Sequence, residues 1–149
     1  VMRSHDQHLD FDLDLAKSSS NDNPVYYIQY AHSRICSVFV KAEQLDMNYN
    51  RAIGVASLDL LTQEHEIAMT RLLSRYPETI EIAARTRSPH ILAYYLQDLA
   101  NGLHSYYNAH HFMVENENLR NARLALIDAV RQVFRSGLKI IGVASPEKM

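Results

Sequence analysis

The sequence predicts an all-α fold, a helical bundle of about five helices with a short extended segment in front of it. Apolar residues recur at the three- and four-residue spacing of amphipathic helices along much of the chain. Glycine and proline number only four each in 149 residues, which disfavours a loop-rich all-β fold. Hydrophobic residues make up 47% of the chain and charged residues 21%, so a buried core is expected.

The first 22 residues have a different pattern from the rest. The stretch LDFDLDL alternates apolar and acidic residues at period two, which is typical of an extended segment. Its apolar face consists of Leu9, Phe11, Leu13 and Leu15. Between them stand Asp10, Asp12 and Asp14, and a solvated strand edge is favoured over a divalent-metal site because no glycine turn or further oxygen ligands follow at calcium-loop spacing. We therefore interpret residues 1–22 as the tail of a preceding unit and a linker, and residues 23–149 as one helical domain.

Helix-start signals divide the first half of this domain. Asn23 followed by Pro24 predicts a helix over about 24–41, because asparagine caps helices and proline is tolerated in the first turn. Residues 42–56 are weakly patterned, contain Gly54, and are predicted to form a loop. Ser57 is expected to cap a second helix over about 58–75.

Three further helices are expected in the second half. Tyr76-Pro77 predicts a break and a short third helix, because proline disfavours helical geometry at the preceding residue. Ser88-Pro89 predicts a fourth helix over about 89–112. The polar stretch 115–118 leads into a fifth helix over about 118–141, which ends near Gly142.

The fifth helix carries most of the arginines of a basic C-terminal region. Residues 119–149 hold six basic and two acidic side chains, whereas residues 1–22 hold two basic and five acidic ones. At 100° per residue the predicted apolar face comprises Leu119, Ala122, Leu126, Val130, Val133, Ile140 and Ile141. An adjoining face gathers Arg120, Arg131 and Arg135, with Arg123 between the two faces. Arginine pairs with phosphate through two N–H groups, so this face is a candidate nucleic-acid contact, although solvated arginine faces are common.

Tyrosines form the second candidate feature. The chain has nine tyrosines and no tryptophan. Those on the expected first and fourth helices are Tyr26, Tyr27, Tyr30, Tyr94, Tyr95, Tyr106 and Tyr107. Single-stranded RNA is read by stacking bases on such rings and bonding their edges to polar neighbours such as Asn108. The alternative is that tyrosines fill a helical core with their hydroxyls at its rim, which we expect for part of this set.

Catalytic and metal-binding interpretations are weaker. His32 and Cys36 are spaced for a thiol–imidazole pair, but no orienting third group accompanies them. The group His104, His110, His111 and Glu115 lacks the spacing of a zinc-binding helix, and no nucleotide-binding glycine loop occurs. We expect no catalytic site, no metal site and no cofactor within this chain. No apolar stretch is long enough for a membrane span, no signal peptide is evident, and the single cysteine favours the cytoplasm.

Three stretches resemble the class I arginyl-tRNA synthetases. They are FDLDLAKSSSNDNPVYYIQYAHSRICSV at 11–38, SPHILAYYLQDLANGLHSYYN at 88–108, and ARLALIDAVRQVFRSGLKIIGVASPEKM at 122–149. Together with their flanks they cover residues 9–41 and 58–149 in the family's order, which leaves mainly the predicted loop unmatched. The resemblance implies the C-terminal anticodon-binding (DALR-type) helical domain of that family. It also implies a parent arginine–tRNA ligase that uses ATP with Mg in a catalytic domain whose motifs are absent here, so this part alone should be inactive.

The resemblance further implies a partner and a set of binding residues. The partners would be the anticodon loop of tRNA-Arg and the catalytic domain of the same chain, and a monomer is expected. Positions that match the family's binding pattern, with the adjacent Asn108, are Tyr27, Tyr30, Arg34, Tyr107, Asn108, His111, Arg131, Arg135 and Met149. The resemblance implies a tryptophan in relatives at position 111, so His111 departs from the family's pattern. The alternative function is a helical protein-interaction or dimerisation module, whose binding would depend less steeply on salt than RNA binding does.

Overall fold

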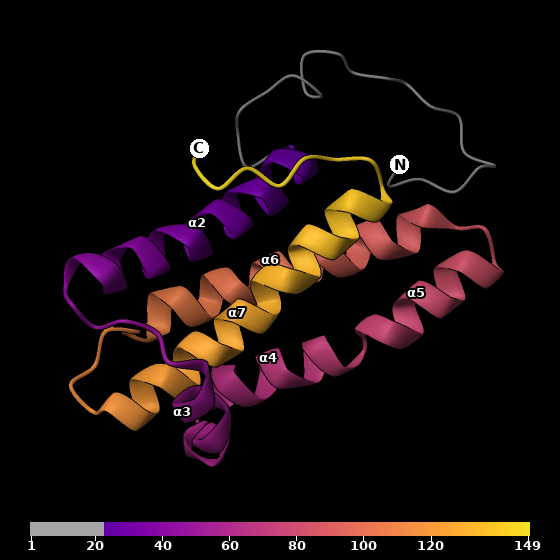
Figure 1. Cartoon of the computed structure of the whole chain (residues 1–149). Helices are drawn as coiled ribbons and strands as arrows, with labels where there is room; N and C mark the ends of the chain where they lie inside the picture. Colours follow the sequence, from indigo (N-terminus) through magenta and orange to yellow (C-terminus); the bar gives the residue numbers. More distant parts are fainter. Residues whose placement is uncertain (1–22) are drawn as a thin grey trace.

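The computed structural model describes residues 23–149, which form six α-helices and one short 3₁₀ helix without strands (Figure 1). The elements are α2 (Pro24–Gln44), α3 (Arg51–Ala56), η1 (Leu58–Leu60), α4 (Glu64–Ser74), α5 (Tyr76–Arg85), α6 (Pro89–Ala109) and α7 (Glu117–Ile140). The all-α prediction is confirmed. The predicted extended segment, with the acidic triplet inside it, falls outside the described residues. None of the described helices is long and apolar enough to cross a membrane.

The helices that begin with an asparagine cap or a proline start where the sequence predicted. The side chain of Asn23 accepts hydrogen bonds from the backbone N–H groups of Val25 and Tyr26, and α2 runs on to Gln44. Helix α6 begins at Pro89 but ends at Ala109, before the predicted residue 112. The Asn116 side chain accepts from the N–H of Leu119 at 3.0 Å and so caps α7.

The predicted loop over 42–56 is wrong in its second half, where α3 lies. The side chain of Asn50 caps α3 by accepting from Ala52 N–H at 3.0 Å, and its own N–H donates to Asn121 Oδ1 at 2.6 Å. Gly54, which suggested a loop, is needed for packing: a Cβ there would lie 2.6 Å from the carbonyl oxygen of Asn121 on α7. Asn50 is thus a local helix-start signal of the same kind as Asn23, and the loop prediction passed over it.

The predicted helix over 58–75 is also corrected. Ser57 makes no capping hydrogen bond and precedes only η1, and the α-helix begins later, at Glu64. The reason lies in Glu66, whose carboxylate accepts from the N–H of Gln63 at 2.9 Å and fixes the helix start there.

The core lies where α2, α6 and α7 meet, with α4 and α5 following one another along the other side of α6 (Figure 1). Its fully buried large side chains include Ile28, Ile35, Leu96, Leu99, Leu103, Tyr106, Ile127, Phe134 and Leu138. On α7 the predicted face is confirmed for Ala122, Leu126 and Val130, which are buried. It is wrong for Ile140, which is 56% exposed, because the buried stripe continues through Phe134 and Leu138 instead.

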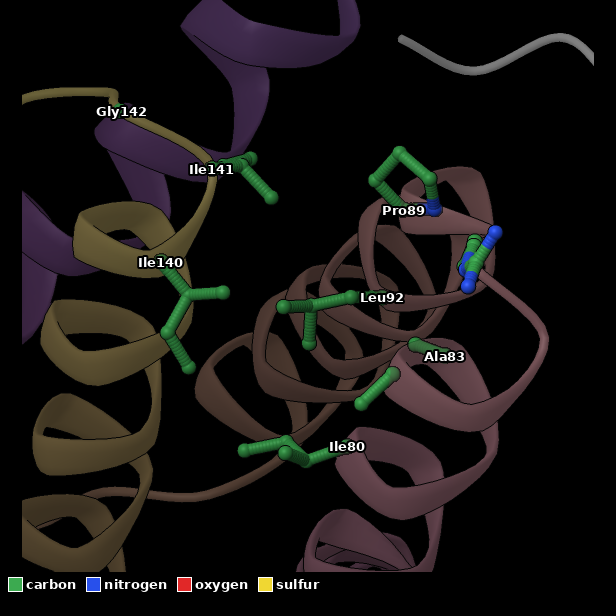
Figure 2. Close-up of a pocket in the computed structure, with 9 residues that line it drawn as sticks. Ile80, Ala83, Pro89, Leu92, Ile140, Ile141 and Gly142 are labelled. Atoms are coloured by element: carbon green, nitrogen blue, oxygen red, sulfur yellow. The ribbon is translucent and has the colours of Figure 1, made fainter. Parts of the chain in front are cut away.

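Ile140 borders an apolar groove of about 650 Å³ between α5, the start of α6 and the end of α7. Figure 2 shows Ile80 and Ala83 of α5 on one side, Ile140 and Ile141 on the opposite side, and Leu92 and Pro89 of α6 above Ile80 and Ala83 in the view. None of the predicted RNA-binding residues lines this groove.

A buried ion pair fastens α7 to α4. Arg123 was predicted to lie between the apolar and arginine faces, but it is 8% exposed and its Nε lies 2.8 Å from Glu66 Oε1. Its Nη1 donates to the carbonyl of His111 at 2.7 Å, and Tyr106 Oη donates to Glu66 at 3.3 Å. Burial, followed by the negative charge of Glu66, raises the pKa of Tyr106. Arg123 is therefore a structural residue.

Candidate nucleic-acid interface

Four of the predicted binding residues meet between α2 and α6. Tyr27, Tyr30 and Arg34 follow one another at helical spacing on α2, and Arg34 lies over the ring of Tyr107 on α6. The Cζ atom of Arg34 lies 3.9 Å from the ring centroid of Tyr107 and 5.8 Å from that of Tyr30. A guanidinium this close to a tyrosine face is held by cation–π attraction.

His104 of α6 is at the centre of these residues, and the sequence interpretation missed its role. Its ring stacks on Tyr30 with centroids 5.6 Å apart and lies 4.8 Å from the ring of Tyr27. Its Nδ1 accepts a hydrogen bond from Nη1 of Arg34 at 3.0 Å. We call Tyr27, Tyr30, Arg34, His104 and Tyr107 the α2–α6 cluster. His104 precedes Tyr107 by one helical turn, and this spacing is the sequence signal that could have revealed it.

The α2–α6 cluster predicts a specific acid sensitivity. Burial, and then the positive charge of Arg34, lowers the pKa of His104 from 6.5 to about 4. Between these values the unfolded chain binds a proton that the folded chain does not, so the contribution of His104 to stability is lost as pH falls from about 6.5 to about 4. Urea denaturation at several pH values should therefore reveal a steeper loss of stability on acidification for the wild type than for His104→Asn. Parallel pH profiles of the two proteins would contradict the assignment.

The last turn of α6 extends this surface. Asn108 and His111 are exposed, and Tyr107 and Phe112 are in ring contact with centroids 5.6 Å apart. A groove of about 430 Å³ beside them is also lined by Lys41 of α2. The backbone of His111 is fixed by Arg123, while its side chain remains accessible.

The predicted arginine face of α7 is divided by local pairing. Arg131 is not free: its Nη2 lies 2.6 Å from Asp128 Oδ1 and its Cζ lies 4.5 Å from the ring centroid of Phe39. Arg120 donates to the carbonyls of Val114 and Glu115 and so holds the loop before α7. Arg135 is exposed.

Arg131 and Arg135 line a polar recess of about 400 Å³ on the other side of α2. Arg51 of α3 joins them there, in the part of the chain that was predicted to be a loop, and Asp128 and Glu147 supply negative charge. This recess is a second basic surface, separate from the α2–α6 cluster.

The C-terminal tail closes the recess because it is anchored along α2. The Gln29 side chain donates to the carbonyl of Ala144 at 2.8 Å, and Ser33 Oγ and His32 Nδ1 each lie 2.8 Å from the carbonyl oxygen of Pro146. Met149 at its end is 48% exposed. No sequence pattern predicted these contacts, because the partners stand more than a hundred residues apart.

The tail contact also shows which ring nitrogen of His32 carries the proton. A carbonyl oxygen only accepts, so Nδ1 of His32 carries the proton that it donates to Pro146. Although Cys36 Sγ lies 4.0 Å from the same nitrogen, that nitrogen cannot act as a base toward the thiol. Burial raises the pKa of Cys36, so the pair does not form an activated thiolate.

The family model for the DALR anticodon binding domain matches residues 28–149. The chain belongs to this family. The matched range contains most of α2 and the whole of α6 and α7, and therefore nearly all of the α2–α6 cluster.

Relatives with curated names agree with the family. The chain is 57% identical over 149 residues to an arginine–tRNA ligase of Coxiella burnetii (strain CbuK_Q154), covering all of this chain and 25% of that protein. A solved arginyl-tRNA synthetase of Thermus thermophilus matches with a TM-score of 0.71 and 30% identity over 90% of this chain and 22% of that one. A Campylobacter jejuni structure assigned as an arginyl-tRNA synthetase matches with a TM-score of 0.84 and 28% identity, covering 99% of this chain and 31% of that chain. The chain thus spans about a quarter of the length of the curated relative.

Within this DALR-family domain the histidines are dispersed. His104 lies against α2, whereas His110 contacts the rings of Tyr106 and His65. Over residues 23–149 no three His, Cys, Asp or Glu side chains are arranged to hold a metal ion.

Proposed function

We propose that this chain is the anticodon-binding part of an arginine–tRNA ligase and that it binds the anticodon loop of tRNA-Arg. Membership of the DALR family and the names of the long relatives support this proposal. The observation that carries it is the α2–α6 cluster, in which the Cζ atom of Arg34 lies over the ring of Tyr107 at 3.9 Å from its centroid. The remainder of the parent protein would bind ATP with Mg and join arginine to tRNA in the cytoplasm, as a monomer.

The α2–α6 cluster suits unstacked bases. Tyr30 is 37% exposed, and Tyr107 is half-buried with Asn108 exposed beside it. Bases of a single-stranded loop stack on such rings and on arginine planes, and their edges bond to amides and backbone groups. The amide of Asn108 can thus read the edge of a base that stacks nearby.

The recess on the other side of α2 suits the RNA backbone. Arg135 is exposed and has no ion-pair partner among the described residues, whereas Arg131 is neutralised in part by Asp128. Contacts to phosphates position an RNA without reading its sequence. We therefore assign positioning to the recess and base identity to the α2–α6 cluster.

Replacing Tyr107 tests this assignment. Tyr107→Ala should weaken binding of an arginine anticodon stem-loop by about 1–3 kcal/mol, because one stacking platform is lost. The loss should be smaller for an unrelated loop of equal length. Fluorescence anisotropy titrations at one salt concentration would measure both.

The matched control is Tyr94→Ala. Tyr94 lies on the same helix, is 49% exposed, and lies outside the α2–α6 cluster. Its replacement should leave the affinity for both loops unchanged. Equal losses of affinity for Tyr107→Ala and Tyr94→Ala, or for the two loops, would mean that the α2–α6 cluster does not recognise the RNA sequence.

A further inference from the structure

We propose that His104 is a positioning residue for RNA recognition, because it holds the Arg34 guanidinium over Tyr107 without neutralising its positive charge. This inference rests on the proposed function, since Arg34 would be the group that meets the RNA. His104 itself lies behind Arg34, between α2 and α6, and need not touch the RNA.

The hydrogen bond fixes the protonation state of His104. Guanidinium groups only donate, so Nδ1 of His104 must accept the 3.0 Å bond from Arg34 and the proton of the neutral ring must be on Nε2. Nε2 is buried and has no hydrogen-bond partner within residues 23–149. An apolar ring at position 104 would avoid the buried, unsatisfied N–H of Nε2. What histidine adds at this position is therefore Nδ1, the acceptor that faces Arg34.

The charge of Arg34 is left uncompensated. The arginine ion pairs found across residues 23–149 involve Arg85, Arg123 and Arg131, and not Arg34. A carboxylate would hold a guanidinium equally well but would cancel its charge. A neutral imidazole instead supplies an acceptor without a negative charge. The rings of Tyr30 and Tyr107 are uncharged as well, so the Arg34 cation still attracts a base or a phosphate.

Three substitutions separate the possible roles of His104. His104→Phe keeps a ring against Tyr27 and Tyr30 but removes the acceptor, and it should weaken binding of the arginine anticodon stem-loop about tenfold. His104→Asn keeps an acceptor at nearly the same place as Nδ1 and should bind close to the wild type. His104→Asp keeps the acceptor but pairs with Arg34, so it should bind weakly and reduce the log–log salt slope by about one.

Controls separate positioning from folding and from general charge. Thermal denaturation of each variant establishes that it is folded, and Ser105→Asp adds the same negative charge at the neighbouring exposed position. Ser105→Asp should bind more tightly than His104→Asp. Equal binding by these two variants, or wild-type binding by His104→Phe, would overturn the inference.

The wild-type protein provides a test that needs no His104 variant. Nitrogen-15 spectra of the histidines should find the His104 proton on Nε2, and Arg34→Met should raise the pKa of this ring. A proton on Nδ1 in the wild type would overturn the inference. Arg34→Ala separates the two proposals: if it weakens RNA binding while His104→Phe does not, the proposed function stands and only the positioning role fails. If Arg34→Ala binds like the wild type, the proposed interface itself fails.

Discussion

Arg123→Met should destabilise the chain by about 3–5 kcal/mol, the cost of leaving one partner of a buried ion pair alone. The carboxylate of Glu66 is fully buried and receives Nε of Arg123 at 2.8 Å. The same substitution removes the hydrogen bond that Arg123 donates to the carbonyl of His111, near the start of the loop between α6 and α7. Urea denaturation followed by far-UV circular dichroism would measure the loss.

Two further variants make this result specific. Arg135→Met, on the exposed side of the same helix, should change stability by no more than about 0.5 kcal/mol. Combining Glu66→Gln with Arg123→Met removes the charge that is left behind, and should recover part of the loss. Equal stability of Arg123→Met and Arg135→Met would mean that Arg123 is a surface residue like Arg135.

Phe134→Ala should cost about 3–5 kcal/mol, because it empties a fully buried position on α7. Ile140→Ala is the matched control, since Ile140 was predicted to belong to the core but is 56% exposed. Its replacement should cost about 0.5 kcal/mol or less. The two variants therefore distinguish the predicted apolar face of α7 from the observed one.

Denaturation midpoints of both variants provide the measurement, with far-UV circular dichroism as a check that each is helical at the start. A larger loss of stability for Ile140→Ala than for Phe134→Ala would mean that the end of α7 belongs to the core. The side chain of Ile140 would then have to be covered by neighbouring side chains that fill the groove in Figure 2.

Helix starts could be predicted because their signals are local. Asn23 and Asn116 bond to N–H groups two or three residues ahead, and Pro89 begins α6 wherever the chain goes next. The starts of α3 and α4 also have local signals, in the Asn50 side chain and the Glu66 carboxylate, but the prediction followed Gly54 and Ser57 instead. Gly54 lies against Asn121, and the carboxylate that begins α4 is the one that pairs with Arg123.

The sequence predicted individual residues of the candidate site but not how they come together in the fold. Helical spacing placed Tyr27, Tyr30 and Arg34 on one helix, and their meeting with Tyr107 depends on how α2 packs on α6. Periodicity placed Arg123 between the two faces of α7 but could not show that it is buried, since a helix position becomes buried only when a neighbour covers it. The tail contacts could not be predicted for the same reason.

We propose that this chain reads an anticodon loop through the α2–α6 cluster. The most direct test titrates it with an arginine anticodon stem-loop and with the same stem-loop whose three anticodon bases are changed, over a series of salt concentrations. Both affinities should fall linearly on a log–log plot as salt rises, because each complex releases counterions from phosphate contacts. The arginine loop should bind more tightly at every salt concentration, and Arg34→Ala should remove that difference. Equal affinity of the wild type for the two loops would contradict the claim.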